Sequence, residues 1–344
     1  MINKEQSRFL GIDIGGVNLK YSDENGRGKI IYFPMWKNFR QLKDRLEEIR
    51  EKTNPEVVGV VITAELSDAF ENKAEGINFI SKAAIDAFER VYFLSIDGEL
   101  SNSIDDPLRY SASNWVASVL FLRERYDNFL FVDIGSTTLD LIPVKNKVLA
   151  AKTDFERMKR EELIYIGALR TPVCCLFPEY RKLHLAAELF AIVADAFILT
   201  RDISQNEYTV ETPDGRGRSR EECLSRLARM FCADVDEIGE SFIIEFAHEI
   251  KRKMVKMISE TIDRHLSDYN LKTVIGCGVG EFLIEEAMKE VKGMRGMKGM
   301  QTEHQAEYIS LRRIYGKVSD LFPSFAMANL VANLVAGLPK EDQE

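Results

Sequence analysis

The residues best suited to chemistry lie in two turns that repeat each other 120 residues apart. "LGIDIGGVNLKY" covers residues 10–21 and "FVDIGSTTLDLIPV" covers 131–144. In each copy an aspartate, Asp13 or Asp133, follows an apolar run and is itself followed by a glycine-containing turn. Backbone N–H groups at such a turn are unshielded and can form a concavity that binds an anion. A carboxylate beside the anion can hold Mg²⁺ or orient a nucleophile.

A single Asp-x-Gly turn is most often a structural hairpin, but two copies in register favour phosphate binding. We therefore predict two phosphate-binding turns that face each other across a cleft, with Asp13 and Asp133 as candidates both for catalysis and for binding Mg²⁺. The remaining candidates at the turns are Gly15, Gly16, Asn18 and Lys20 at the first, and Gly135, Ser136, Thr137 and Thr138 at the second.

Arginines supply further candidates for contact with phosphate. Arg170 lies in "GALRTPV", where the following proline favours an extended or turn conformation. Its guanidinium could bind a phosphate through two hydrogen bonds, or form a structural ion pair. Arg216, Arg218 and Arg220 alternate in "DGRGRSR", which suits either a mobile lid over a diphosphate or a solvated charged face.

Other polar residues leave two interpretations open. Thr63 and Glu65 follow a predicted strand end, where α/β proteins place ligand contacts, but a helix N-cap with a solvated glutamate fits equally well. Asp154 and Arg157 are expected at a helix cap and on its exposed face. Glu188 and Asp195 are expected on one face of one helix, either as paired buried charges or at a cleft.

The hydrophobic periodicity indicates alternating strands and helices, and therefore an α/β architecture. The repeated turns begin two halves, 1–126 and 127–344, and the second carries a mainly helical insertion at about 155–270. Ser219 and Glu222 have the spacing of a capping box, and "KGMRGMKGM", 292–300, is expected to be a surface loop. Strands are expected at 8–14, 56–63, 91–96, 129–144 (a hairpin) and 272–278, and helices at 107–126, 184–199, 240–267, from 281, and at 323–337.

Composition excludes several classes of protein. The net charge of −9 argues against nucleic acid as the main partner, although local basic clusters could bind a small phosphorylated molecule. We expect no membrane partner, because no apolar run approaches the roughly 20 residues of a transmembrane helix. The N-terminus lacks the apolar region of a signal peptide, so a cytoplasmic protein is expected. Five cysteines without a CxxC pair, and four scattered histidines, indicate neither a disulfide framework nor a zinc site.

Several motifs resemble the actin, sugar-kinase and chaperone ATPase superfamily. The paired turns are similar to its two phosphate loops, and "TVIGCGVGEFL", 273–283, resembles its adenosine motif. "SASNWVAS", 111–118, and "AMANLVANLVAG", 326–337, resemble its two connecting helices. The resemblance implies duplicated actin-like, ribonuclease H-like α/β domains. It also implies a nucleotide-like pocket at Gly276, Gly278 and Gly280.

Longer motifs resemble one branch of that superfamily, the hydantoinase/oxoprolinase-like proteins, and in particular the archaeal synthases of methanofuran biosynthesis. Members of that family join a furan-methanamine diphosphate to γ-glutamyltyramine and release diphosphate. The resemblance therefore implies a transferase with small-molecule substrates and Mg²⁺, and leaves a homo-oligomer open. ATP enters only under the alternative of a small-molecule kinase or oxoprolinase-like hydrolase, and a nucleotide-switched assembly protein is a third interpretation. The motifs are "FPMWKN" (33–38), "VVITAELSDAF" (60–70), "SASNWVA" (111–117), "VDIGSTTLDLIPV" (132–144), "GALRTPV" (167–173) and "ETPDGRGRSREE" (211–222).

Overall fold

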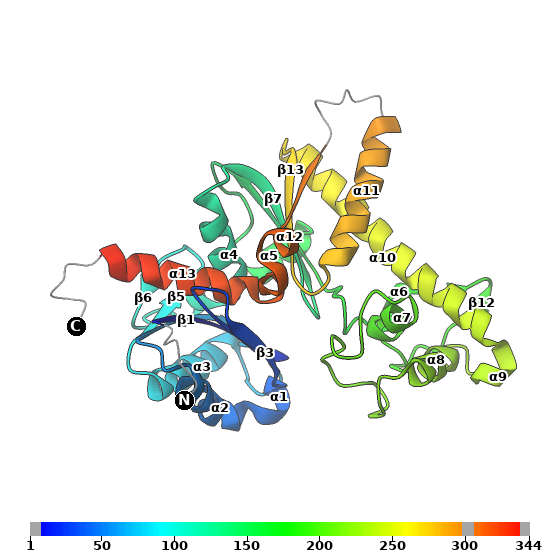
Figure 1. Ribbon diagram of the computed structural model, residues 1–344, viewed down its shortest axis with the longest axis horizontal. Coiled ribbons are helices and arrows are strands. Elements are labelled where there is room, and N and C mark those ends of the chain that lie inside the picture. The colour runs from blue at the N-terminus through cyan, green and yellow to red at the C-terminus, as the bar shows by residue number, and fades with distance from the viewer. Residues whose placement is uncertain (1–7, 298–305, 338–344) are drawn as a thin grey trace, which may run out of the picture. The chain divides into compact units, whose positions relative to one another are not determined.

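The computed structural model describes residues 8–297 and 306–337, and the chain divides into two compact units (Figure 1). Unit 1 combines the segment that ends at Asp127 with Asn146–Arg160 and the segment from Arg312 onward. Unit 2 comprises Asn128–Lys145 and Glu161–Leu311. The first boundary follows Asp127, one residue after the boundary expected from the sequence, and both units are discontinuous because the chain returns to unit 1 twice.

Unit 1 is built on a sheet with the strand order β3-β2-β1-β4-β5-β6. The β1–β2 and β2–β3 pairs are antiparallel, whereas β1–β4 and β4–β5 are parallel. Its strands are β1 Phe9–Gly15, β2 Asn18–Asp23, β3 Gly28–Tyr32, β4 Val57–Thr63, β5 Val91–Leu94 and β6 Leu100–Ser101. Its other elements are α1 Met35–Asn38, η1 Phe39–Gln41, α2 Leu42–Thr53, α3 Lys73–Ala87, η2 Pro107–Tyr110, α4 Asn114–Arg123, β9 Lys147–Val148, α5 Asp154–Lys159, η4 Gly316–Leu321 and α13 Phe322–Gly337.

Helices cover both faces of this sheet, with α13 on one face and α1–α3 on the other (Figure 1). Two strand glycines allow α13 to pack closely. A Cβ on Gly11 would lie 1.9 Å from the Ser324 carbonyl oxygen, and one on Gly59 would lie 2.6 Å from the Met327 side chain. By length and composition alone, Leu311–Gly337 could cross a membrane, but 61% of its most apolar window is buried inside the protein. Its last part, α13, packs on the unit 1 sheet as a core helix does.

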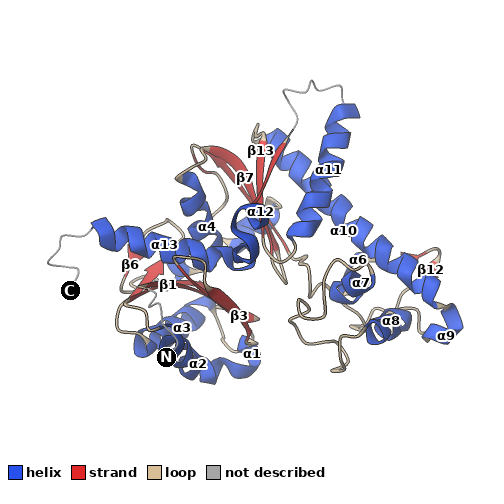
Figure 2. Cartoon of the chain, in the orientation of Figure 1, coloured by secondary structure: helices blue, strands red, loops and turns tan. Residues whose placement is uncertain are grey.

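Unit 2 repeats the same strand order as β10-β8-β7-β13-β14. Again the first strand pairs antiparallel with its hairpin partner and parallel with the next strand, β13. Because both sheets share this arrangement, the predicted fold class of duplicated actin-like, ribonuclease H-like domains is confirmed (Figure 2). The sheet strands are β7 Asn128–Ile134, β8 Leu139–Lys145, β10 Leu163–Ile164, β13 Thr273–Cys277 and β14 Glu307–Ser310, followed by α12 Leu311–Tyr315 at the junction of the units.

Residues 161–270 of the expected helical insertion belong to unit 2, whereas residues 155–160 belong to unit 1. The capping box of Ser219 and Glu222 at the start of α8 is confirmed. The long helix α10 packs against α7, α8 and α11 (Figure 1). The elements are α6 Val173–Leu176, β11 Glu179–Tyr180, β12 Leu183–His184, α7 Val193–Leu199, α8 Arg220–Arg229, α9 Val235–Ile238, α10 Glu240–Asp268 and α11 Glu281–Met297.

Three expected elements differ from the structure. The helix over 107–126 is a 3₁₀ turn followed by the shorter α4. The helix over 184–199 begins only at Val193, because residues 191–193 bond to the backbone of the segment after Arg170, so Glu188 does not share a helix with Asp195. The loop over 292–300 is wrong for residues 292–297, which continue α11. Residues 298–300 lie outside the described residues.

Candidate functional site

The carboxyl edge of the unit 1 sheet brings together polar residues from three segments. Asp13 lies near the end of β1 and is 4% exposed. Thr63 ends the neighbouring strand β4, and its hydroxyl donates to Asp13 Oδ1 at 3.2 Å. Gly15 lies directly opposite Thr63 in the parallel register, so the first turn adjoins the end of β4. Ser111 forms an isolated parallel bridge with Ile62, which places the start of "SASNWVAS" at the same edge.

Glu65 is the buried carboxylate of this edge. It is 3% exposed, so the solvated glutamate considered from the sequence is wrong. Ser111 Oγ donates to its Oε1 at 2.5 Å, and Lys73 Nζ from the start of α3 donates to Ser111 Oγ at 3.2 Å. The second oxygen, Oε2, is buried and has no hydrogen-bond partner among the described residues. Burial raises the pKa of Glu65, against the opposing effects of the Ser111 hydrogen bond and the Lys73 charge.

Close packing and an unusual backbone conformation position the cluster of Glu65, Ser111 and Lys73. A Cβ on Gly76 would lie 2.4 Å from the Glu65 carbonyl oxygen, so the first turn of α3 packs directly on the backbone of Glu65. Ala112, which follows Ser111, has a φ of +50° and is buried. A non-glycine residue in this left-handed region costs of the order of 1–3 kcal/mol and persists where the surroundings impose it. The neighbouring Ser113 is also buried, and its Oγ has no partner within the described residues.

Arg157 and Trp115 flank the same connection in unit 1. Arg157 is 2% exposed, so its expected place on an exposed helix face is wrong. Its guanidinium carbon lies 5.1 Å from the centre of the Trp115 ring, and it pairs with Asp154 at 3.1 Å. Thr153, rather than Asp154, caps this helix by accepting from Glu156 N. The stacked guanidinium and its carboxylate partner therefore hold α5 against the start of α4.

The first turn is fixed by contacts within unit 1. Met35 N, at the start of α1 in the "FPMWKN" motif, donates to Gly16 O at 2.9 Å. A Cβ on Gly15 would lie 2.9 Å from Asn18 O, whereas one on Gly16 would meet nothing within 4 Å. Lys20 lies opposite Asp13 across the β1–β2 pair. The predicted first-turn residues are therefore gathered at one end of β1.

The second turn, in unit 2, packs on the segment that contains Arg170. Ala168 N donates to Gly135 O at 2.9 Å, and Arg170 N donates to Ser136 O at 2.9 Å. A Cβ on Gly167 would lie 2.4 Å from Thr137 N, so only glycine permits this approach. The "GALRTPV" motif thus adjoins the turn from Gly135 to Thr138, as a phosphate role for Arg170 requires. Whether its guanidinium contacts a phosphate stays a prediction.

Asp133 lies against the loop of the predicted nucleotide-like pocket. A Cβ on Gly278, whose φ is +96°, would lie 2.3 Å from Asp133 Oδ1. The other two glycines are explained by packing. A Cβ on Gly276 would lie 2.8 Å from the Tyr308 ring, and one on Gly280 would lie 2.4 Å from the Ile134 side chain. Their part in holding a ligand stays a prediction.

The "DGRGRSR" loop is tied to unit 2 by its own charges. Arg218 donates to Val210 O at 3.0 Å and lies over the Tyr208 ring, whereas Arg216 is exposed. Arg220 is the first residue of α8 and pairs with Glu240 at 2.5 Å. Arg216 is exposed, and the Arg220 side chain is also 41% exposed within its ion pair.

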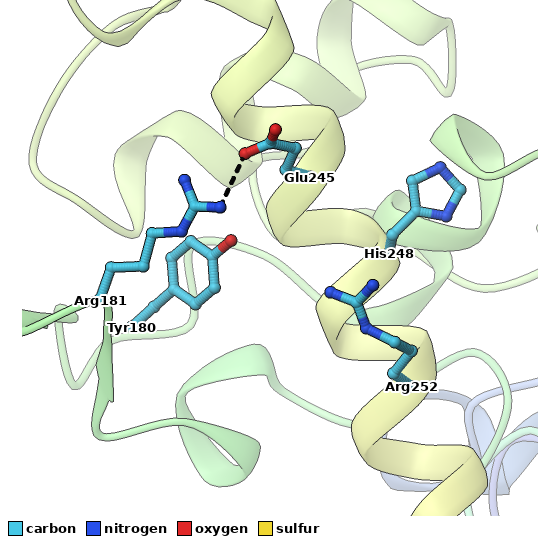
Figure 3. Close-up of a pocket in the computed structure, with 5 residues that line it drawn as sticks. All are labelled: Tyr180, Arg181, Glu245, His248 and Arg252. Carbon is cyan, nitrogen blue, oxygen red and sulfur yellow. Dashed lines mark ion pairs between the residues drawn. The ribbon is translucent and has the colours of Figure 1, made fainter.

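A pocket of about 350 Å³ lies in the helical insertion (Figure 3). Arg181 reaches across it to Glu245 on α10 and forms an ion pair at 3.0 Å. Arg252, also on α10, bonds to Glu249 through two nitrogens. Because both arginines are paired, the pocket offers no unpaired cation for a phosphate, and it contains none of the predicted site residues.

The candidate Mg²⁺ ligands are Asp13 in unit 1 and Asp133 in unit 2. Within the described ranges no three His, Cys, Asp or Glu side chains gather in a way that could hold a metal ion. Mg²⁺ keeps several waters and commonly takes one or two carboxylates together with substrate phosphates. A buried carboxylate beside each of the two predicted phosphate-binding turns fits that pattern.

Comparisons with known proteins identify the family. A model of the hydantoinase/oxoprolinase family matches residues 56–309. A protein of Methanocaldococcus jannaschii, named (4-{4-[2-(γ-L-glutamylamino)ethyl]phenoxymethyl}furan-2-yl)methanamine synthase, is 40% identical over 337 residues, which cover 94% of this chain and 97% of that protein. The chain belongs to this synthase family, within the hydantoinase/oxoprolinase proteins.

A second relative and a solved structure also match this chain. A Methanococcus vannielii protein with the same name is 31% identical over 220 residues, covering 62% of this chain and 95% of that protein. A crystal structure of a ROK family glucokinase from Streptomyces griseus, in complex with glucose and AMPPNP, covers 94% of this chain and 98% of its own, with 14% identity and a TM-score of 0.49. The resemblance to methanofuran-biosynthesis synthases is therefore confirmed, and membership of the synthase family indicates an enzyme.

Sequence reasoning did not place Ser111 or Lys73 in a site, and it left Glu65 undecided. The available signal was positional. Glu65 follows a strand end in "VVITAELSDAF", and Ser111 opens "SASNWVAS". The sequence does not show that the two segments meet.

Proposed function

We propose that this chain is a transferase that joins a furan-methanamine diphosphate to γ-glutamyltyramine. The phenolic oxygen of the acceptor forms a new bond to the furan-bearing methylene carbon, and the bond from that carbon to the diphosphate oxygen breaks. The products are the aryl ether and diphosphate, with one proton released from the phenol. The observation that carries the proposal is the 40% identity to the synthase over 94% of the chain.

The two repeated turns supply the anion-binding part of this mechanism. Backbone N–H groups of either turn, around Gly15 and Gly16 or around Gly135 and Ser136, would hold phosphate oxygens of the substrate and stabilise the charge that develops as the diphosphate leaves. Arg170, whose backbone bonds to Ser136, is the nearest candidate cation at the second turn. Preorganised donors of this kind cost no reorganisation when the bond breaks.

Mg²⁺ fits the same two positions. Asp13 or Asp133 would hold the ion, which would supply positive charge to neutralise the diphosphate when bound. The remaining steps belong to the chain itself: it positions the acceptor, excludes water from the developing cation on the furan methylene, and accepts the phenolic proton.

The test is a reaction without ATP. Purified protein, Mg²⁺, the furan diphosphate and γ-glutamyltyramine should yield the ether by mass spectrometry, with one diphosphate for each ether. A matched reaction contains ATP in place of the furan diphosphate. Ether formed without ATP supports the proposal. No ether, together with ATP turnover on a small-molecule acceptor, would instead support the alternative of a small-molecule kinase or oxoprolinase-like hydrolase.

A further inference from the structure

We propose that Glu65 is the base that accepts the phenolic proton of the acceptor, with Ser111 and Lys73 as residues that position it. The inference rests on the proposed function and assigns a role to a residue outside the two repeated turns. It places the phenol of the acceptor at the carboxyl edge of the unit 1 sheet.

The hydrogen bonds leave one carboxylate oxygen for a substrate. Oε1 is held by Ser111 Oγ at 2.5 Å, and Ser111 in turn accepts from Lys73 Nζ at 3.2 Å. Oε2 is buried with no partner within the described part of the chain. A buried polar atom without a partner carries a desolvation cost of about 1–3 kcal/mol, more for a charged group, so its presence needs an explanation. A phenolic O–H donating to Oε2 would satisfy it.

The surroundings fix this carboxylate in place. Gly76 allows α3 to pack on the backbone of Glu65, and the strained Ala112 presents Ser111 to it. Such strain at a single residue is typical of functional sites. Glu65 also lies two residues beyond Thr63, which bonds to Asp13 beside the first turn. The base and the anion-binding turn therefore belong to the same sheet edge.

Proton transfer favours a carboxylate with a raised pKa. A phenol has an ordinary pKa of about 10, so an ordinary glutamate is a weak match as its base. Burial raises the pKa of Glu65, and Asp154 on α5 raises it further, while Ser111 and the Lys73 charge from α3 lower it. The carboxylate must be ionised to act, so activity falls as pH drops through this raised pKa.

Access to Glu65 requires movement of the segment that covers it. The segment between β4 and α3 carries Leu66, which is 63% exposed, directly beside the buried Glu65. Ser67 Oγ in the same segment has no hydrogen-bond partner among described residues. An acceptor would reach Oε2 by displacing this short connection.

The test compares the full-length wild-type protein with Glu65→Gln, using γ-glutamyltyramine and an analogue whose phenol is more acidic through ring fluorination. Glu65→Gln should lower kcat by about 10²–10⁴-fold, the usual contribution of general base catalysis, with KM changed only a few-fold. The loss should be smaller with the more acidic phenol, because that acceptor depends less on a base. Glu71→Gln, an exposed glutamate in the same unit, is the matched control and should behave as wild type.

The pH profile provides a second, independent readout. Ser111→Ala removes an effect that lowers the pKa of Glu65, so the acid limb of kcat/KM should move to higher pH. Asp154→Asn removes an effect that raises it, so the limb should move to lower pH. If Glu65→Gln does not fold by circular dichroism, these opposite shifts decide the question.

The outcomes separate the two proposals. Ether formation by Glu65→Gln within about threefold of the wild type, an equal loss with both phenols, or a loss confined to KM would overturn the base assignment and leave the proposed function intact. Shifts of the acid limb in the same direction for Ser111→Ala and Asp154→Asn would also overturn it. A wild-type protein that forms no ether overturns the proposed function and, with it, the assignment.

Discussion

Arg226→Met would remove the cation that neutralises a fully buried carboxylate in the helical insertion of unit 2. Arg226 on α8 and Asp195 on α7 are both 0% exposed. Arg226 donates to Asp195 Oδ1 through Nε at 2.8 Å and lies 2.7 Å from it through Nη2. It also bonds to Asp214 at 3.0 Å and to Gly217 O at 3.1 Å. One side chain therefore joins α7, α8 and the loop between them.

The expected loss of stability depends on the interactions that Asp195 keeps after Arg226 is replaced. Asp195 keeps hydrogen bonds from Tyr208 OH and Ile192 N but loses its charge partner. Removing one partner of a buried ion pair costs about 3–5 kcal/mol, because the other charge stays buried and uncompensated. Asp214 adds little to this loss, since Arg229 still pairs with it at 2.9 Å.

Arg220→Met on the same helix is the matched control. Arg220 and Glu240 have side chains 41% and 51% exposed, and an exposed pair contributes at most about 1 kcal/mol. The expected difference between the two variants is therefore at least about 2 kcal/mol. Adding Asp195→Asn to Arg226→Met should recover part of the loss, because the double variant no longer buries an unpaired charge.

Hydrogen exchange of peptides from α7 and α8, measured by mass spectrometry over a urea series, is the appropriate assay. Trp36 and Trp115 both belong to unit 1, so tryptophan fluorescence would not report on the insertion. Burial raises the pKa of Asp195, and the loss of Arg226 removes an effect that lowers it. The cost of Arg226→Met should therefore shrink as pH falls, because a protonated carboxyl no longer buries a charge. A cost below about 1 kcal/mol, or equal to that of Arg220→Met, would refute the reasoning.

Three further substitutions test other features. Gly278→Ala should lose stability and ether formation, because the new Cβ strains a positive φ, at about 1–3 kcal/mol, and also clashes with Asp133. Gly239→Ala is the control for the backbone strain alone, because Gly239 has a similar φ of +79° and a Cβ there would meet nothing within 4 Å. Equal effects of the two substitutions on urea unfolding would contradict the contact with Asp133. Ser219→Ala should cost about 1 kcal/mol in urea unfolding through loss of the capping box at α8, and no change would contradict that role. Gly11→Ala should lower Tm by overpacking β1 against a carbonyl oxygen of α13, at about 1–3 kcal/mol, and an unchanged Tm would contradict the close packing.

The repeated strands and the long amphipathic helix were predictable because local periodicity determines them. The β7–β8 hairpin and α10 lie close to the predicted ranges, since strict alternation and helical spacing are local signals. The helix predicted over 184–199 is wrong for residues 184–192 because of a tertiary interaction. An apolar run that could form a helix is held extended at residues 191–193 by bonds to Thr171 and Val173. Long-range pairing of this kind leaves no periodic signal.

The part of the candidate site formed by the repeated glycine and aspartate turns could be predicted from the sequence. The part formed by contacts between distant segments could not. The turns at Asp13 and Asp133 follow from residue types alone. The cluster of Glu65, Ser111 and Lys73 depends on contacts between residues 38 and 46 positions apart. The burial of Glu65, which changes its chemistry, is likewise a tertiary property. Sequence spacing could only mark Glu65 as a residue at a strand end.

The account is tested most directly by following the phenolic oxygen of the acceptor. γ-Glutamyltyramine labelled with ¹⁸O at the phenol is incubated with the furan diphosphate, Mg²⁺ and the full-length protein, and both products are analysed by mass spectrometry. The account predicts that the ether retains all of the ¹⁸O and that the released diphosphate contains none. An ¹⁸O-labelled aryl phosphate or aryl diphosphate in place of the ether would show that the phenol attacks phosphorus rather than the furan methylene, as in a kinase, and would contradict the account.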